Sequence, residues 1–97
     1  MIKHIVMWKL KDENKAANAT KMKQMLEDLI PIIPEITELE VGLADSTPND
    51  ACSDLVLYSV FASQADLDTY QQHPSHQAVV AFAKTVVIER RVVDYTL

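Results

Sequence analysis

The order of periodic segments in this sequence predicts an α+β domain with the element order β-α-β-β-α-β and an antiparallel four-stranded sheet. Four segments alternate between two faces or are rich in β-branched residues, as strands are. The segments between them carry helical periodicity or helix start signals. A chain of 97 residues is long enough for one compact domain and too short for two, so we place a single domain at residues 1–97.

The first strand is predicted at residues 2–10, IKHIVMWKL, where side chains alternate between two faces. One face carries the even positions Ile2, His4, Val6, Trp8 and Leu10. The other face carries Ile5 and Met7 between two lysines. On this pattern His4 points into the core beneath the helices.

The first helix is predicted from about Asn14 to Ile30, because apolar residues recur there at steps of three and four. Pro31 and Pro34 end this helix, since proline lacks an amide proton and restricts the residue before it. Residues 36–44, ITELEVGLA, alternate again and predict the second strand. The side opposite its glutamates carries Thr37, Leu39, Val41 and Leu43.

The third strand is predicted at residues 55–62, LVLYSVFA, which are apolar on both faces. This pattern is typical of a strand in the middle of a sheet. Ser63, with Asp66 three residues later, resembles a helix N-cap with its reciprocal acid. We therefore predict a short helix that runs to about Gln72.

A second helical piece is predicted from Pro74 towards Thr85, since proline suits the first turn of a helix. Residues 86–97 are rich in β-branched residues and predict the last strand. This order is that of a ferredoxin-like sheet with helices on one face only. The apolar side chains of the other face, including Ile5 and Met7, need a cover, and we expect a second copy of the chain to supply it.

Composition and charge exclude several kinds of partner. The net charge is -5 and the lysines are scattered, so neither nucleic acid nor an anionic membrane is an expected partner. The sequence has no signal-peptide pattern and no apolar run long enough to span a membrane. Cys52 is the only cysteine, which rules out an internal disulfide and fits a cytoplasmic location.

Four short motifs together resemble the family of stress-responsive A/B barrel domains. They are IKHIVMWKLK at the start, IIP after the first helix, YQQHPSH, and RRVVDY near the end. The resemblance covers essentially the whole chain and implies a homodimeric α+β barrel with a small apolar pocket on each subunit. Most members of this family have no assigned activity, and we expect neither a cofactor nor a metal in this chain.

One plant branch of that family closes a linear polyketide by aldol condensation. The pocket histidines and tyrosine of that cyclase match His4, Tyr70 and His76 here, whereas its first-helix tyrosine falls on Leu26. The resemblance therefore implies a pocket for a small apolar carbonyl ligand, while the leucine in place of the tyrosine weakens the transfer of the cyclase's substrate and reaction to this chain. The remaining candidate residues of this pocket are Val6, Trp8 and Leu26.

The three matching residues suit acid-base chemistry. His76 lies near a helix start, where exposed amides disfavour a positive imidazole, so it should stay neutral near pH 7 and act as a general base. Tyr70 could donate its hydroxyl to a carbonyl oxygen as negative charge develops, and His4 would orient the substrate or His76. In the alternative interpretation these residues are structural: Tyr70 has its hydroxyl at the surface, His73 caps a helix, and His76 bonds to backbone.

Two further interpretations remain open at this stage. His4, His73 and His76 could bind zinc or copper, although the proline between the last two makes them a poor helical pair. The chain could also be a cofactor-free monooxygenase, by analogy with antibiotic-biosynthesis oxygenases of the same fold. Trp8 on the inner strand face is the one residue that favours this analogy.

Overall fold

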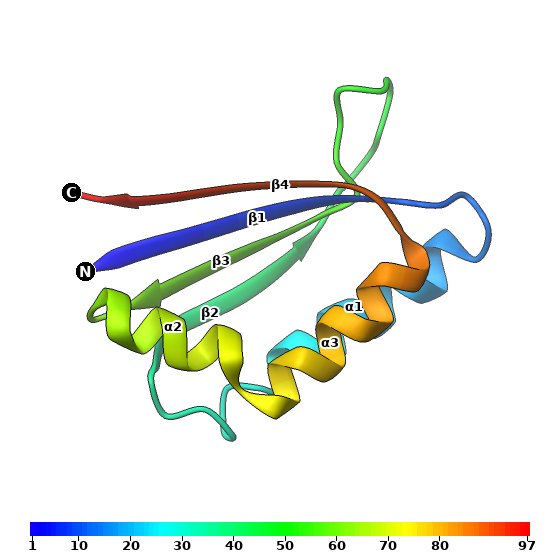
Figure 1. Cartoon of the computed structure of the whole chain (residues 1–97). Helices are drawn as coiled ribbons and strands as arrows, with labels where there is room; N and C mark the ends of the chain where they lie inside the picture. The colour runs from blue at the N-terminus through cyan, green and yellow to red at the C-terminus, as the bar shows by residue number, and fades with distance from the viewer.

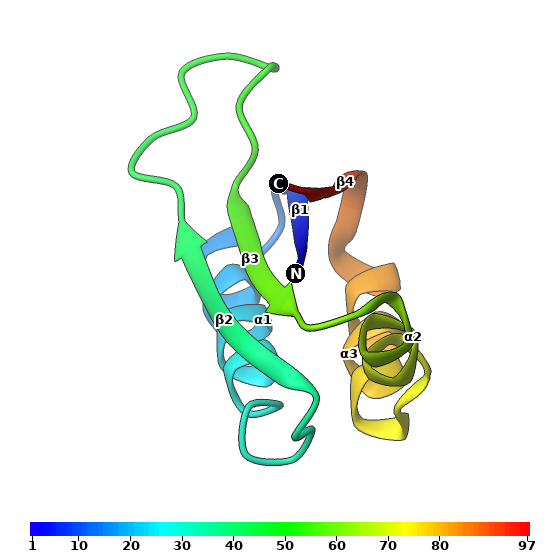
Figure 2. The same ribbon diagram turned by 90° about the vertical axis from the view of Figure 1, so that its left-hand side faces the viewer.

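The computed structural model describes residues 1–97 and confirms the predicted ferredoxin-like α+β fold. The elements are β1 (Ile2–Leu10), α1 (Lys15–Glu27), β2 (Ile36–Leu43), β3 (Leu55–Phe61), α2 (Gln64–Gln72), α3 (Pro74–Val86) and β4 (Val87–Thr96). The strands form one antiparallel sheet in the order β2-β3-β1-β4. All three helices lie on one side of this sheet (Figure 1), and the view in Figure 2 shows α1 and α3 next to each other beneath it.

Helix α1 ends at Glu27, earlier than the predicted end at Ile30. The amides of Leu29 and Ile30 donate to carbonyl groups three residues back, at 3.1 and 3.2 Å. Such bonds belong to a tighter helical turn, which is common at helix ends. The turn prepares the chain for Pro31, which disfavours helical geometry at the residue before it. The predicted burial of the apolar stripe is confirmed for Leu29, which is buried in this turn, but it was wrong for Ile30, which is 46% exposed.

The start of β2 differs from strict alternation. A register shift between Ile36 and Glu38 lets Ile36 pair with Phe61 on the inner face and leaves Thr37 exposed. Ile36 therefore packs against the core, and the prediction that Thr37 shares the apolar side was wrong. A β-bulge of this kind adds one residue to a strand, and no periodic pattern reveals it.

The predicted break between α2 and α3 is confirmed, and one residue makes it. His73 ends α2 and is the N-cap of α3, where its Nδ1 accepts a hydrogen bond from the amide of Ser75 at 3.0 Å. Pro74 is the first residue of α3 and has no amide proton to satisfy. Upstream, Ser63 caps α2 by accepting from the amide of Asp66 at 3.2 Å. These caps set the direction of α3 across the sheet.

The hydrophobic core lies between the helices and the inner face of the sheet. The opposite face of the sheet, which we call the open face, has no helix over it (Figure 1). Partly or largely exposed hydrophobic residues on the open face are Ile5, Met7, Val56, Tyr58, Val93 and Tyr95. None of the three helices has the length and apolar character that a membrane span needs.

Asp54 fixes the far end of β1 and was not singled out from the sequence. Its carboxylate is buried and accepts a hydrogen bond from the amide of Leu10 at 2.7 Å. The ammonium group of Lys15 lies 3.6 Å from the other carboxylate oxygen. The backbone amide of Asp54 also donates a hydrogen bond to the backbone oxygen of Trp8 at 2.8 Å. This one residue therefore joins β1, the start of α1 and the loop before β3.

Candidate functional site

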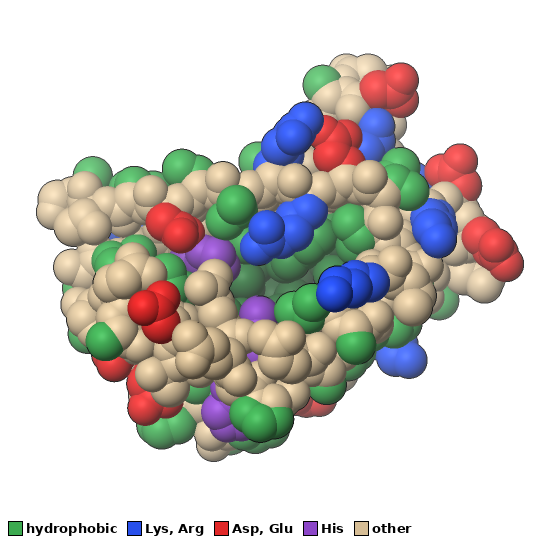
Figure 3. Space-filling model, in the orientation of Figure 1, with side chains coloured by type: hydrophobic (Ala, Val, Ile, Leu, Met, Phe, Trp, Pro, Cys, Tyr) green, Lys and Arg blue, Asp and Glu red, His purple; other side chains and the backbone are tan.

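A cavity of about 410 Å³ lies between α3 and the strands β1 and β4, with α1 at its base. Its volume lies in the lower part of the range of roughly 300–1,000 Å³ that is usual for small-molecule sites. Most of its lining is hydrophobic, and Val6, Trp8 and Leu26 are part of it. Figure 3 shows this hollow with hydrophobic side chains inside and histidine and basic side chains around it. That these residues bind a ligand stays a prediction.

His4 lines the cavity from β1 and is almost completely buried. Its Nδ1 lies 2.5 Å from a carboxylate oxygen of Asp94, its direct partner across the β1–β4 pair. A carboxylate accepts hydrogen bonds, so the proton is on Nδ1 and Nε2 is left for a ligand. Ser59, the partner of His4 on β3, donates its hydroxyl to the backbone oxygen of His4 at 3.0 Å. His4 is therefore fixed from both neighbouring strands.

His76 lines the same cavity from the first turns of α3. Its Nδ1 lies 3.1 Å from the backbone oxygen of Gln71, which can only accept, so here too Nε2 carries no proton in the neutral ring. Burial lowers the pKa of His76, and the hydrogen bond to Gln71 partly opposes this decrease. The nearby His4 and Arg90 lower the pKa further. The side chain is therefore a neutral imidazole at pH 7, with the protonation state that a general base needs.

Tyr70 is fully buried behind the two histidines and does not line the cavity. Its ring centroid lies 4.5 Å from that of His76, 4.9 Å from that of Phe61 and 6.4 Å from that of His4. Its hydroxyl is buried without a hydrogen-bond partner, and this burial raises the pKa of Tyr70. The interpretation with a surface hydroxyl is therefore wrong, and direct action of the hydroxyl on a carbonyl stays a prediction.

The geometry does not support a metal site. The three histidines do not come together, and no three His, Cys, Asp or Glu side chains are placed to hold a metal ion. His73 uses its Nδ1 to cap α3, as the structural interpretation expects. His4 and His76 each use Nδ1 for a different protein acceptor.

Four residues of the site were missed from the sequence. Asp94 holds His4, Gln71 holds His76, and Lys84 and Arg90 lie at the cavity surface. Only Asp94 had a usable signal, since an acidic residue in the last strand can face a histidine in the first when the two strands pair. The contact of Gln71 depends on the break between α2 and α3, and the positions of Lys84 and Arg90 depend on where α3 meets β4.

The sequence model of the Stress Responsive A/B Barrel Domain family matches residues 2–97. The chain belongs to this family. The match covers strand β1, which carries His4, and helix α3, which carries His76, so the candidate site lies entirely inside the A/B barrel domain. Comparison with curated proteins finds no match.

Solved structures of other proteins have the same fold as this chain. A dimeric protein of unknown function from Bacteroides fragilis is 33% identical, with 99% of this chain and 95% of that chain covered and a TM-score of 0.89. A hydroxynitrile lyase from Passiflora edulis is 20% identical, with 99% and 92% covered and a TM-score of 0.85. A putative antibiotic biosynthesis monooxygenase from Nitrosomonas europaea is also 20% identical, with 100% and 98% covered and a TM-score of 0.79. The last two share only the fold with this A/B barrel domain.

Proposed function

We propose that the cavity binds a small, mainly apolar carbonyl compound and that His76 removes a proton from the carbon next to its carbonyl group. One observation carries this proposal: His76 is a neutral imidazole on the wall of an apolar cavity, with Nδ1 bonded to Gln71 and Nε2 available. In the proposed step the C–H bond breaks, the proton goes to Nε2, and the electron pair moves to the carbonyl oxygen. The enolate can then take a proton back or attack a second carbonyl group.

His4 is the second group that meets the ligand. Because Asp94 fixes its Nδ1–H, the ring presents only Nε2 to the cavity ligand, either as an acceptor or, when protonated, as a donor to the enolate oxygen. Tyr70 enters the proposal through its ring, which packs against His76 and limits how that side chain can turn.

The fold alone does not choose among activities. Proteins described as a hydroxynitrile lyase and as a putative monooxygenase share it, so the proposal rests on the side chains of the cavity. An aldol-type cyclisation is the form of this chemistry that the family's plant cyclases suggest. Leu26 on the cavity wall gives this chain a more apolar pocket than a tyrosine would, which favours a less polar substrate.

The proposal can be tested by proton exchange, which needs no knowledge of the natural substrate. The protein is incubated with acetophenone or phenylacetone in deuterated buffer, and loss of the protons next to the carbonyl group is followed by NMR. A positioned general base contributes roughly 10²–10⁴-fold, so His76→Gln should lower the exchange rate by at least about 100-fold. His73→Gln is the matched control, because His73 caps α3 without lining the cavity. An unchanged rate in folded His76→Gln protein would refute the proposal.

We further propose that two copies of the chain pair through the open face. Several apolar side chains there, among them Met7 with 40% of its surface exposed, have no cover in the single chain. Exposed apolar patches of this kind are uncommon on monomers, and a two-fold axis would let the same patch cover itself. The Bacteroides fragilis protein, 33% identical, is described as dimeric, which supports the pairing.

We also propose a cytoplasmic location. Cys52 is the only cysteine, so the fold depends on no disulfide and suits a reducing compartment. Fractionation of the native host, followed by immunodetection, would test this proposal.

A further inference from the structure

Two basic side chains at the cavity have no partner in the protein. Lys84 lies in the last turn of α3, and Arg90 lies on β4 directly opposite Trp8. Both line the cavity, both are exposed, and neither takes part in an ion pair or a side-chain hydrogen bond. The one acidic residue of the lining, Glu89, is paired with Arg91 at 2.8 Å.

Most of the other lysine and arginine side chains of this acidic chain already contact a carboxylate or an aromatic ring. The residues that pair with a carboxylate are Lys9, Lys15, Lys23 and Arg91. Lys3 and Lys21 lie over the rings of Tyr58 and Phe82. This leaves Lys11, Lys84 and Arg90, and two of these three belong to one cavity. Positive charge is therefore left uncompensated mainly where a ligand would enter.

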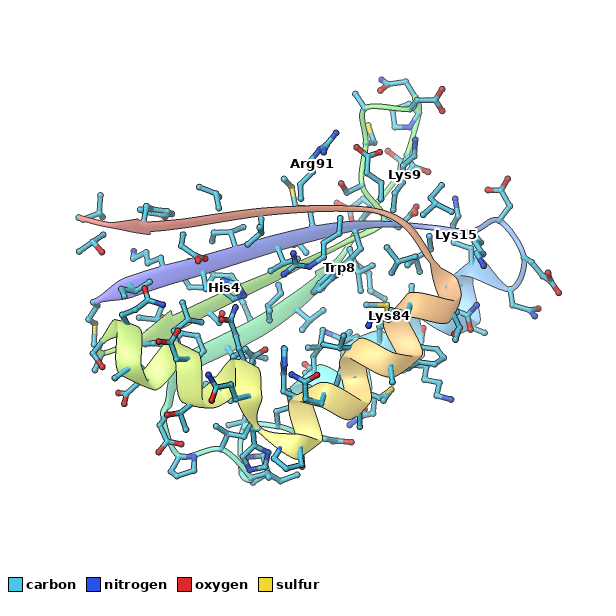
Figure 4. The ribbon with its side chains drawn as sticks, viewed as in Figure 1. His4, Trp8, Lys9, Lys15, Lys84 and Arg91 are labelled. Atoms are coloured by element: carbon cyan, nitrogen blue, oxygen red, sulfur yellow. The ribbon has the colours of Figure 1, made fainter.

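The two cations come from different walls. Figure 4 shows Lys84 on α3, below the sheet, while Arg91 points away from the helices on the far side of β4. Arg90, the neighbour of Arg91, is on the cavity side because it pairs with Trp8 of the inner face. Arg90 and His76 line the same cavity, and the charge of Arg90 contributes to lowering the pKa of His76. A ligand in the cavity would thus meet a cation on each side and an imidazole beyond them.

We propose that the ligand of this cavity is an apolar carbonyl compound with an anionic group, a carboxylate or a phosphate, and that Lys84 and Arg90 bind this group. This inference rests on the function proposed above and names its substrate class. The apolar body lies against Val6 and Trp8, and the carbonyl group lies near His76. The planar guanidinium of Arg90 suits two-point binding of a carboxylate or phosphate, and Lys84 adds a mobile point charge from the opposite wall.

The test compares three probes that share a phenyl ketone body: benzoylpropionate, its methyl ester, and phenacyl phosphate. Affinity is measured by titration calorimetry with the full chain at low and at high salt. The anionic probes should bind more tightly than the ester, and only their affinity should fall with salt. In the double variant Lys84→Gln/Arg90→Gln, their affinity should fall by roughly three- to tenfold, as expected for two solvent-screened charge contacts. Lys11→Gln removes one positive charge away from the cavity and should leave all three affinities unchanged.

The outcomes separate this inference from the proposed function. If benzoylpropionate and its ester bind equally tightly, or if both lose the same affinity in the double variant, the inference of an anionic ligand is overturned. The proposed function would not be affected by that result, because it is tested separately by proton exchange of neutral ketones. Preference for phenacyl phosphate alone would support the inference and identify phosphate as the anion, and preference for benzoylpropionate alone would identify carboxylate. Failure of all three probes to bind would overturn both.

Discussion

Replacement of Tyr70 by phenylalanine should stabilise the protein or leave its stability unchanged. The Tyr70 side chain is completely buried, and its hydroxyl has no hydrogen-bond partner in the protein. A buried hydroxyl without a partner costs about 1–3 kcal/mol, whereas the ring contacts with His76 and Phe61 persist in Tyr70→Phe. The gap left by one oxygen atom offsets part of the gain, so we expect a net stabilisation of about 1 kcal/mol.

Urea unfolding measures this change directly. For a small domain, 1 kcal/mol moves the urea midpoint upward by roughly 0.3–1 M and the melting temperature by about 4–8 °C. Destabilisation of Tyr70→Phe by more than about 1 kcal/mol would show that the hydroxyl has a partner and would refute the reasoning. In the exchange assay Tyr70→Phe should keep its rate, and a large loss would show that the hydroxyl reaches the bound ketone.

Three other predictions concern separate parts of the molecule. Burial lowers the pKa of His76 from its ordinary 6.5, so as the pH falls the unfolded chain binds a proton at this residue before the folded chain does. The free energy of unfolding should therefore decrease as the pH drops below 6.5. In urea titrations at different pH, His76→Gln should weaken this dependence. Asp54→Ala should cost about 1–3 kcal/mol, because it leaves the buried amide of Leu10 without its acceptor, whereas Lys15 keeps its ion pair with Asp12; a urea midpoint close to wild type would contradict this role. Met7→Glu should shift the sedimentation of the chain at micromolar concentration from dimer to monomer, and an unchanged dimer would place the contact elsewhere.

The sequence was sufficient for the fold because local patterns and tertiary structure agree along most of the chain. The alternation of residues 2–10 predicts a strand with His4 inward, and the apolar third strand predicts a central position; both are confirmed. The Ser63 cap and the break at Pro74 follow from local chemistry that does not depend on distant residues. The errors lie where the local pattern breaks, at the bulge beside Thr37 and at the tighter turn that ends α1 early at Glu27.

The site was predictable only in part, for a physical reason. Strand alternation placed His4 on the inner face, and the helix signals placed His76 near a helix start without giving its face; both residues line the cavity. Burial of the Tyr70 hydroxyl could not be foreseen, since it depends on how α2 packs between Phe61 and the histidines. Periodicity gives the direction of a side chain but not the depth at which neighbouring elements cover it.

The most consequential feature that periodicity misses is a bulge in the pairing of β1 with β4. Leu10 pairs with Val87, but Lys9 pairs with Glu89, so Ile88 is an extra residue in β4. Without it, strict alternation from the inward-facing Val87 would turn every later residue of β4 to the opposite face, because a shift of one residue exchanges the two faces of a strand. With the bulge, Val87 packs on the core while the residues opposite His4 and Trp8 are Asp94 and Arg90. The inserted residue Ile88 thus turns two later side chains towards the inner face: the carboxylate that fixes His4 and the guanidinium group that we assign to ligand binding.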